Sequence, residues 1–563
     1  MSVLTLNYNL MKHFIYIIFG GVLCLTACKK SNIEQTPLEK WTKDVIFDPT
    51  DSLGNYAKNF LNDTYVQLPT GFNRIGTTFG SISANDILDA ASDDAISSRN
   101  ASNVESFTNG RISSNAPVDD AWAKNYVGIR RVNYFLANIG IVPFKQSMVV
   151  EKNYWIAESR FLRAMFYFEL FKRYGGVPLL GDRILNLDDD LSLRRNSQDE
   201  VAQYILSEIE AVKDKLRPNP IQDADIGRAS KAAALALKSR LLLYLASPLY
   251  NPGNAPAKWQ AAAIAAKDLM SLTATLGLEA SFQSMFLNRK NKEVILAFQR
   301  NVGTSVEVDN APIGYTDAVA SNGLTSPTQE LVDAFGMKNG KAITDPTSGY
   351  NPNNPYLNRD PRFYSTIFHN GMMWVKRAVQ TFEGGLDKPG GIVTQTRTGY
   401  YMRKFMADFS NATTYSNQTH NPVIFRYAET LLNFAEAQNE FSGPNPEVIK
   451  AVEDIRQRAG LVPFALPTGL SKEQMRIAIR NERRLEMAFE EQRFWDIRRW
   501  KIAEQVLNGK LHGMKITQTA PGVFTYAPFE ASTVSFNALK MYSYPIPYSE
   551  ITKNTNLTQN LGW

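Results

Sequence analysis

Apolar residues recur every three or four positions over several long segments, which is the pattern of helices with one buried face. Residues 154–174 end at Gly175-Gly176, with Pro178 beyond, as helices often do. Residues 197–216 open with Ser-Gln-Asp-Glu, a capping box from Ser197 to Glu200. Both segments are predicted to be amphipathic helices. The first places these side chains on one stripe: Ala157, Phe161, Ala164, Phe168 and Phe171.

Further helical segments follow in pairs. Residues 229–246 and 257–272 are rich in alanine, so their backbones can pack closely. A second set starts near Val423, breaks at Gly443-Pro444, restarts with Asn445 as cap, and continues from a cap at Ser471. Together the pairs predict a mostly α fold, a tetratricopeptide-like scaffold of helical hairpins over about 50–300 and 422–505. No strict repeat of about 34 residues is visible, so the repeat is interpreted as structural only.

The middle of the chain, about 301–421, has a different pattern. Helical periodicity disappears and glycine, proline, asparagine and aromatic residues increase. Strand-like pieces at 293–299 and 372–379 mark its edges. Because long loops in folded proteins often carry function, this segment is predicted to be a ligand-side insertion in a single domain of residues 43–563, followed by a carboxy-terminal segment, 506–563.

Composition fits a large globular domain and excludes little else. The chain is 44% hydrophobic with a formal net charge of +6, and its charges are interleaved. The stretch 480–500 holds six arginines and five acids. A segment that binds nucleic acid would carry an excess of positive charge, which this stretch lacks. We therefore expect the stretch to hold helices together, with Arg426 and Glu429 as candidate partners. Trp495 and Trp500 are expected to lie in the core.

The amino terminus predicts export. A basic head, Lys12-His13, precedes an apolar run of 14 residues, 14–27, which is too short to span a bilayer. The run ends in Leu-Thr-Ala-Cys, which resembles the lipobox of bacterial lipoproteins, so residues 1–27 are predicted to be a signal peptide and Cys28 a lipidated anchor. An ordinary secretory signal or a short buried helix is the alternative. Residues 28–42 are polar and predicted to be a flexible tether.

Motifs of catalysis and of metal or cofactor binding are missing from the sequence. The histidines and cysteines lack zinc-ligand spacing, and no phosphate-binding or dinucleotide fingerprint is present, so we expect no cofactor and no metal. The acidic clusters Asp93-Asp94 and 188–190 are interpreted as turn caps and solvated loop charges. A glycoside hydrolase needs only two opposed carboxylates and stays open as an alternative.

Between about Trp41 and Trp563 the chain contains, in this order, ESRFLRAMFYFELFKRYGGVPLL, NPYLNRDPRFYSTI, FRYAETLLNFAEAQNEF, ERRLEMAFEEQRFWDIRRW and YPIPYSEITKNTNLTQNLGW. These segments and their order resemble the SusD/RagB family of nutrient-binding outer-membrane lipoproteins. The resemblance implies a non-catalytic lipoprotein that faces the cell exterior and delivers oligosaccharide to a SusC-like, TonB-dependent transporter. Exposed family members often carry acids just after the lipidated cysteine, whereas Lys29-Lys30 stands there here.

The resemblance also implies a shallow ligand surface. Its first loop follows the Asp93-Asp94 pair and lacks tyrosine and tryptophan, which argues against starch. The middle segment also offers Phe382 and Tyr415. A SusD-like protein that binds peptides and a structural adaptor without ligand are the remaining alternatives. The predicted ligand-binding residues are Arg99, Asn100, Asn103, Tyr315, Asn322 and Trp374.

Overall fold

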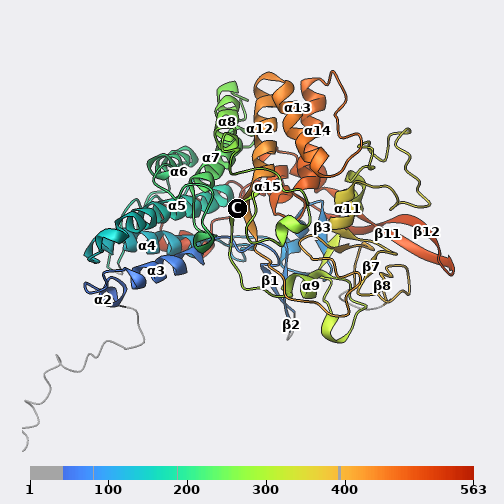
Figure 1. Cartoon of the computed structure of the whole chain (residues 1–563), viewed down its shortest axis with the longest axis horizontal. Helices are drawn as coiled ribbons and strands as arrows, with labels where there is room; N and C mark the ends of the chain where they lie inside the picture. Colours follow the sequence, from blue (N-terminus) through green and yellow to red (C-terminus); the bar gives the residue numbers. More distant parts are fainter. Residues whose placement is uncertain (1–41, 80–81, 187, 391–394) are drawn as a thin grey trace, which may run out of the picture.

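The computed structural model describes residues 42–79, 82–186, 188–390 and 395–563. The predicted signal peptide, Cys28 and nearly all of the tether therefore lie outside the described residues. Within them, none of the helices has the length and apolar character needed to cross a membrane. Helices crowd one side of the molecule, while short strands and loops fill the other side, from which one long hairpin projects (Figure 1).

The amino-terminal half of the scaffold is helical, as the periodicity predicts. Helix α4 packs on α5, α5 on α6, and α7 on α8. The scaffold helices of this half are α2 (Lys43–Ile46), α3 (Asn55–Tyr65), α4 (Trp122–Asn138), α5 (Val149–Tyr174), α6 (Gln198–Val212), α7 (Lys231–Ala246) and α8 (Pro256–Met270). The predicted scaffold range is not helical throughout, because residues 75–107 form strands and short 3-10 turns.

The second helical set continues the first, because α12 packs along α8 (Figure 1). Its members are α12 (Tyr427–Ser442), α13 (Pro446–Arg458), α14 (Lys472–Glu486), α15 (Gln492–Arg499) and α16 (Ala503–Val506). The predicted start near Val423 is wrong, since Val423–Arg426 forms a strand before α12 begins. These four residues pair with Val294–Ala297, and this pairing competes successfully with helix extension.

Local capping signals locate three of the helix starts correctly. Ser197 accepts a hydrogen bond from the Glu200 amide at 3.2 Å, while the Glu200 carboxylate accepts from the Ser197 amide at 2.8 Å. Ser471 and Gln474 form the same box at the start of α14. Asn445 accepts from the Val448 amide at 2.9 Å. These side chains satisfy backbone donors that have no partner within the helix.

Outside the scaffold helices, the described chain contains short helices and antiparallel strand pairs. The short helices are α9 (Ser305–Asn310), α10 (Gln329–Ala334), α11 (Pro361–Thr366) and α17 (Tyr548–Lys553). The strand pairs are β1 (Ile75–Phe79) with β2 (Ile82–Asp86), β3 (Ala95–Ser97) with β5 (Thr325–Pro327), β4 (Val294–Ala297) with β10 (Val423–Arg426), β6 (Ile367–Phe368) with β9 (Tyr401–Met402), β7 (Met373–Trp374) with β8 (Arg377–Ala378), and β11 (Gly509–Ala520) with β12 (Val523–Val534). The long β11–β12 hairpin is not anticipated by the sequence reasoning.

The charge-dense stretch 480–500 is two helices and not one. Helix α14 ends at Glu486 and α15 begins at Gln492. Between them Phe489 and Glu491 adopt positive φ angles of 62° and 60°, which reverse the chain direction. The turn places Glu486 and Glu490 where arginines from other segments reach them. As expected, Trp495 and Trp500 are buried.

Candidate functional site

Two loops that are far apart in sequence meet at the β3–β5 pair. Beyond the end of β3, the Ser98 amide donates to the Leu324 carbonyl at 2.8 Å. The Leu324 amide in turn donates to the Asp309 carbonyl at 2.9 Å, and the Asn322 amide to the Val308 carbonyl at 2.7 Å. These bonds bring the first predicted ligand loop, the loop around Asn322, and helix α9 to one surface.

Four of the predicted ligand residues reach solvent at this place. Arg99 is partly exposed, and Asn100, Asn103 and Asn322 are exposed. The Asn103 side chain donates to the Gly76 carbonyl of β1 at 2.7 Å, so it links the loop to the β1–β2 hairpin. The side chains of Asn100 and Asn322 make no hydrogen bond within the described residues and are free to meet a ligand.

Tyr315 and Trp374 occupy a different environment from the one predicted. Trp374 has 0% exposure, and its indole donates to the Tyr415 hydroxyl at 3.1 Å. Tyr315 is also buried, donates to the Trp374 carbonyl at 2.8 Å, and lies under the Arg377 guanidinium, 3.8 Å from the ring centre. Their rings therefore pack inside the insertion and offer no face to a ligand in this structure, which corrects both assignments.

Tyr415 is the aromatic residue that adjoins the polar loops. Its hydroxyl lies 3.1 Å from the Ser321 hydroxyl, next to Asn322, and its ring is partly exposed. It also contacts Phe409 with a ring-centre distance of 5.1 Å, which fixes its orientation. Phe382, also considered from the sequence, instead packs on Phe524 of the β11–β12 hairpin at 5.4 Å. Tyr415 is thus the better candidate for an aromatic platform.

The sequence reasoning missed two acids of this region, Asp309 and Asp86, and of these two only Asp309 reaches the surface. Asp309, at the end of α9, is partly exposed and lies within the electrostatic influence of Arg99 and Arg300. Burial raises the pKa of Asp309 to about 6, although Arg300 and Arg99 act in the opposite direction. Asp86, at the end of β2, has only 2% exposure, and burial raises its pKa to about 6 as well.

Similarity to known proteins decides the family. Residues 285–563 match the SusD family, and residues 71–243 match a family described as "Starch-binding associating with outer membrane". A solved SusD-like protein from Bacteroides fragilis is 30% identical with a TM-score of 0.76, and the alignment covers 93% of this chain and 100% of that one. The chain belongs to the SusD/RagB family. This confirms the resemblance and the mostly helical fold.

Other members of the SusD/RagB family match over similar lengths. SusD-like protein P2 of Formosa agariphila is 25% identical, covering 96% of this chain and 97% of that protein. A second solved structure, a SusD-like carbohydrate-binding protein from Bacteroides fragilis, is 25% identical with a TM-score of 0.75, covering 90% of this chain and 99% of that one. Both matches extend over at least nine tenths of each of the two proteins compared.

In this SusD-family chain the predicted turn charges Asp93 and Asp94 are buried ion-pair partners. Arg493 contacts both oxygens of Asp93, at 2.8 and 2.7 Å, and Arg484 donates to Asp94 at 2.7 Å. Burial raises the pKa of Asp93, but Arg484 and Arg493 outweigh it and hold the pKa below its usual range. The interpretation as solvated loop charge is wrong for this pair. Residues 188–190, in contrast, are exposed, as expected.

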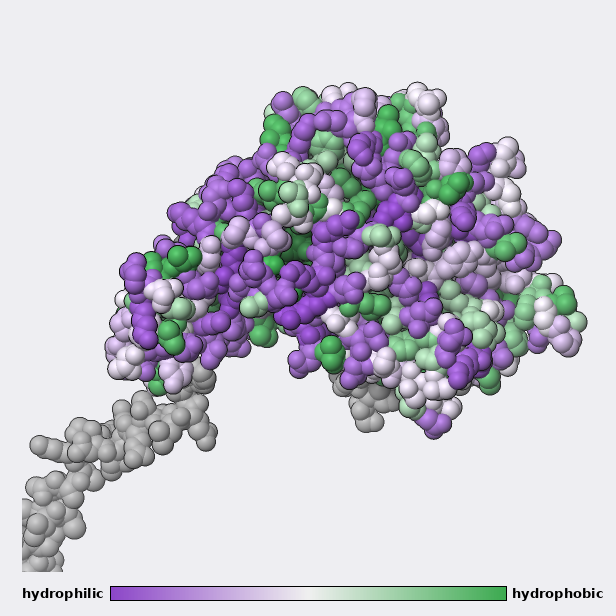
Figure 2. Space-filling view, in the orientation of Figure 1, coloured by the Kyte–Doolittle hydropathy of each residue, from purple (hydrophilic) through white to green (hydrophobic). Residues whose placement is uncertain are grey.

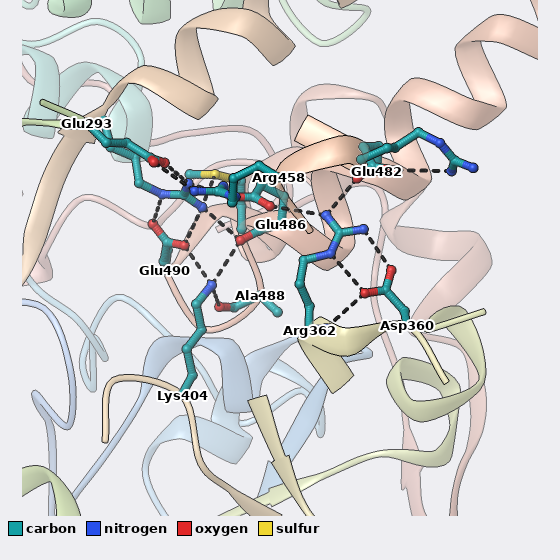
Figure 3. A network of polar contacts seen from close by, with 12 residues as sticks. Glu293, Asp360, Arg362, Lys404, Arg458, Glu482, Glu486, Ala488 and Glu490 are labelled. Carbon is teal, nitrogen blue, oxygen red and sulfur yellow. Dashed lines mark hydrogen bonds and ion pairs between the residues drawn. The ribbon is translucent and has the colours of Figure 1, made fainter. Parts of the chain in front are cut away.

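The charge-dense stretch also binds the insertion. Arg426 has a fully buried side chain and donates to Glu486 at 2.6 Å and to both oxygens of Glu490 at 2.7 Å. Arg362 of α11 reaches Glu482 at 2.6 Å, and Lys404 reaches Glu490 at 2.7 Å (Figure 3). The prediction that Arg426 faces the stretch is confirmed. Glu429 instead pairs with Arg240 at 2.6 Å.

A polar pocket of about 350 Å³ opens beside Asn103. Gly76 and Lys124 stand among its lining residues, and Asp119 and Arg173 pair within it at 2.9 Å. Polar residues also cover most of the face seen in Figure 2, where hydrophobic residues form small separate patches. Among the described residues, histidine, cysteine and acidic side chains form no cluster able to hold a metal ion. The candidate site is therefore polar and open, and the described residues lend no support to a metal centre.

Proposed function

We propose that this protein is a non-catalytic outer-membrane lipoprotein that captures oligosaccharides and delivers them to a SusC-like, TonB-dependent transporter. One observation carries the ligand part of the proposal. Arg99, Asp309, Asn100 and Asn322 meet on one surface, although they come from three segments, and the two amide side chains have no partner among the described residues. This surface presents hydrogen-bond donors and acceptors together.

That combination suits sugars. A hydroxyl group donates one hydrogen bond and accepts others, so a row of hydroxyls needs both kinds of protein group. The C–H face of a sugar ring additionally packs on a flat aromatic side chain, the role we assign to Tyr415. A peptide would instead need apolar pockets and backbone partners along an exposed strand edge. The polar loops around Asn100 and Asn322 favour oligosaccharide.

Anchoring and delivery rest on the sequence and on the family. The lipobox-like Leu-Thr-Ala-Cys ending at Cys28 predicts several acyl chains, which together hold a protein firmly on a membrane. The match over residues 71–243 is to a family described as associating with the outer membrane. A surface-held binding protein passes its ligand inward only through a transporter, for which a barrel of the SusC type is the family partner. Replacing Cys28 by serine is expected to release the protein from membranes.

Titration of the full mature protein against an oligosaccharide panel tests the ligand claim. We expect reversible binding, and chromatography of the oligosaccharides after incubation should show no new product. The double variant Asn100→Ala/Asn322→Ala should bind roughly tenfold or more weakly, because each lost hydrogen bond contributes about 1 kcal/mol. Asn153→Ala is the matched control, since Asn153 is an exposed asparagine on scaffold helix α5.

Three outcomes would contradict the proposal. Release of shortened oligosaccharides would indicate a glycoside hydrolase, and loss of that turnover on replacing two carboxylates by amides would establish one. Binding restricted to a peptide pool would favour the peptide alternative. An unchanged affinity in the double asparagine variant would place the ligand elsewhere on the molecule.

A further inference from the structure

Two arginines on the ligand surface lack protein partners. Within the described residues, Arg99 and Arg300 donate no hydrogen bond from their guanidinium groups, and neither lies within ion-pair distance of a carboxylate. The Nε atom of Arg99 is buried and unpartnered. The only other arginine of the described chain without a side-chain hydrogen bond, Arg480, packs its guanidinium over Trp500 at 4.6 Å. A buried donor such as the Nε–H of Arg99 destabilises the folded protein unless a ligand or a water molecule accepts its hydrogen bond.

Both guanidinium groups are held in place without being neutralised. The Arg300 guanidinium lies over Phe72, 5.6 Å from the ring centre, and its amide donates to the Asn421 side chain at 2.8 Å. Arg99 follows Ser98, whose amide is bonded to Leu324, and its own amide donates to the Ser97 hydroxyl at 3.1 Å. Backbone hydrogen bonds and ring packing therefore position the two side chains.

The acids of this region offset the arginines only in part. Asp309 is influenced by both arginines and is partly exposed, whereas Asp86, which Arg99 also influences, is buried. Glu105 is paired with Arg397. A ligand on this surface therefore meets two guanidinium groups and one carboxylate. Every N–H of a guanidinium is a donor and the group has no acceptor, so donors are in excess.

We propose that Arg99 and Arg300 form a subsite that recognises an anionic substituent, a carboxylate or a sulfate ester, on the bound oligosaccharide. Both substituents are rich in acceptor oxygens and match the planar fork of arginine, which a hydroxyl cannot do. The inference rests on the proposed function, because it assigns the ligand class of the same surface. It identifies the substrates as uronate-containing or sulfated glycans, with neutral glycans bound more weakly.

Matched ligand pairs test the inference on the full mature protein. Oligogalacturonate is compared with its methyl ester, and a sulfated galactan oligosaccharide with its desulfated counterpart. We expect the charged member of at least one pair to bind roughly tenfold or more tightly, since hydrogen bonds to charged groups are about twice as strong as neutral ones. Added salt should weaken that binding, because the interaction is between exposed charges. The pair that shows the preference distinguishes carboxylate from sulfate.

The variants Arg99→Gln and Arg300→Gln should each remove most of the preference, so that the ratio of the affinities for the charged and the neutral member falls toward one. Arg130→Gln is the control, because Arg130 is an exposed arginine on α4 that donates only to the Leu185 carbonyl. Equal affinity for charged and neutral members, or a preference that survives in both variants, would overturn the inference. A chain that binds neutral oligosaccharides only would overturn it but keep the proposed function, whereas failure to bind any glycan would overturn both.

Discussion

Arg493 and Asp93 form a buried two-point ion pair, with Nε donating to Oδ1 at 2.8 Å and Nη2 to Oδ2 at 2.7 Å. Arg493 belongs to α15 of the scaffold, whereas Asp93 stands just before β3, which leads into the loop of Arg99. The Thr328 hydroxyl also donates to the Asp93 carbonyl, at 2.6 Å. The charge-dense stretch thus holds the ligand loop against the helices.

The first prediction concerns this pair. Replacing Arg493 by methionine leaves the Asp93 carboxylate buried with Arg484 as its remaining partner, at 3.0 Å. We expect the free energy of unfolding to fall by about 3–5 kcal/mol, the usual result of removing one member of a buried pair. Chemical denaturation measures the loss. The double variant Asp93→Leu/Arg493→Met should lose less than the single variant, and an equal or larger loss would contradict the ion-pair account.

A second prediction follows from Glu436, which accepts hydrogen bonds from both Arg499 and the Trp500 indole. Burial raises its pKa, but Arg499 outweighs this and lowers it to about 2. A lowered folded-state pKa means that the stabilisation is complete above the unfolded value near 4.5 and is lost as pH falls toward about 2. The contribution is about 3 kcal/mol.

Urea denaturation over a pH series checks this prediction. Glu436→Gln should be less stable than the wild type at pH 7, and the gap should close between about pH 5 and 2 as the wild-type carboxylate takes up a proton. Glu447→Gln provides the control, because Glu447 is an exposed glutamate whose pair with Lys267 lies in solvent. A gap that stays constant throughout the acid range would contradict the role given to the Glu436 charge.

Local signals in the sequence explain what could be predicted. The capping boxes at Ser197 and Ser471 and the break at Gly443 act within one helical turn, so the sequence locates them directly. Asp93 and Arg493 stand 400 positions apart, and no local pattern announces their contact. From the sequence alone Asp93-Asp94 is therefore predicted to be a solvated turn, since acidic side chains usually lie in solvent.

The sequence predicts only part of the candidate site, because some of its residues are brought together by long-range contacts. Arg99, Asn100 and Asn322 lie in loops, where family motifs indicate function and side chains reach solvent. The sequence predicts Trp374 and Tyr315 as ligand contacts, whereas the structure buries both, because a sequence does not reveal to which side an aromatic ring in an irregular segment points. Asp309 joins the surface through the hydrogen bond from Leu324 to its own carbonyl and through the bond from Asn322 to the neighbouring Val308, contacts that lie beside the β3–β5 pair.

The third prediction separates packing from binding within the insertion. Tyr315→Phe removes the hydroxyl that donates to the Trp374 carbonyl, so unfolding should become about 1 kcal/mol easier while the affinity for oligosaccharide stays the same. Trp374→Ala should cost about 3–5 kcal/mol, because it empties a fully buried site. Denaturation and titration of the same samples provide both values. A clear loss of affinity in Tyr315→Phe, without loss of stability, would restore Tyr315 as a ligand contact.

The last prediction concerns the pH dependence of ligand binding through Asp309. Its pKa of about 6 means that acidification through this value neutralises a carboxylate on which Arg300 and Arg99 both act electrostatically, so the local positive charge increases. The affinity for a sulfated oligosaccharide should therefore rise as pH falls from about 8 to 5, since a sulfate ester keeps its charge in this range.

Asp309→Asn should bind more tightly than the wild type at pH 8 and lose most of the pH dependence. Burial raises the pKa of Asp86 to about 6 as well, and Arg99 acts on it electrostatically, so any dependence that persists should disappear in Asp86→Asn/Asp309→Asn. Identical pH profiles in wild type and Asp309→Asn would show that the anion does not sense this carboxylate.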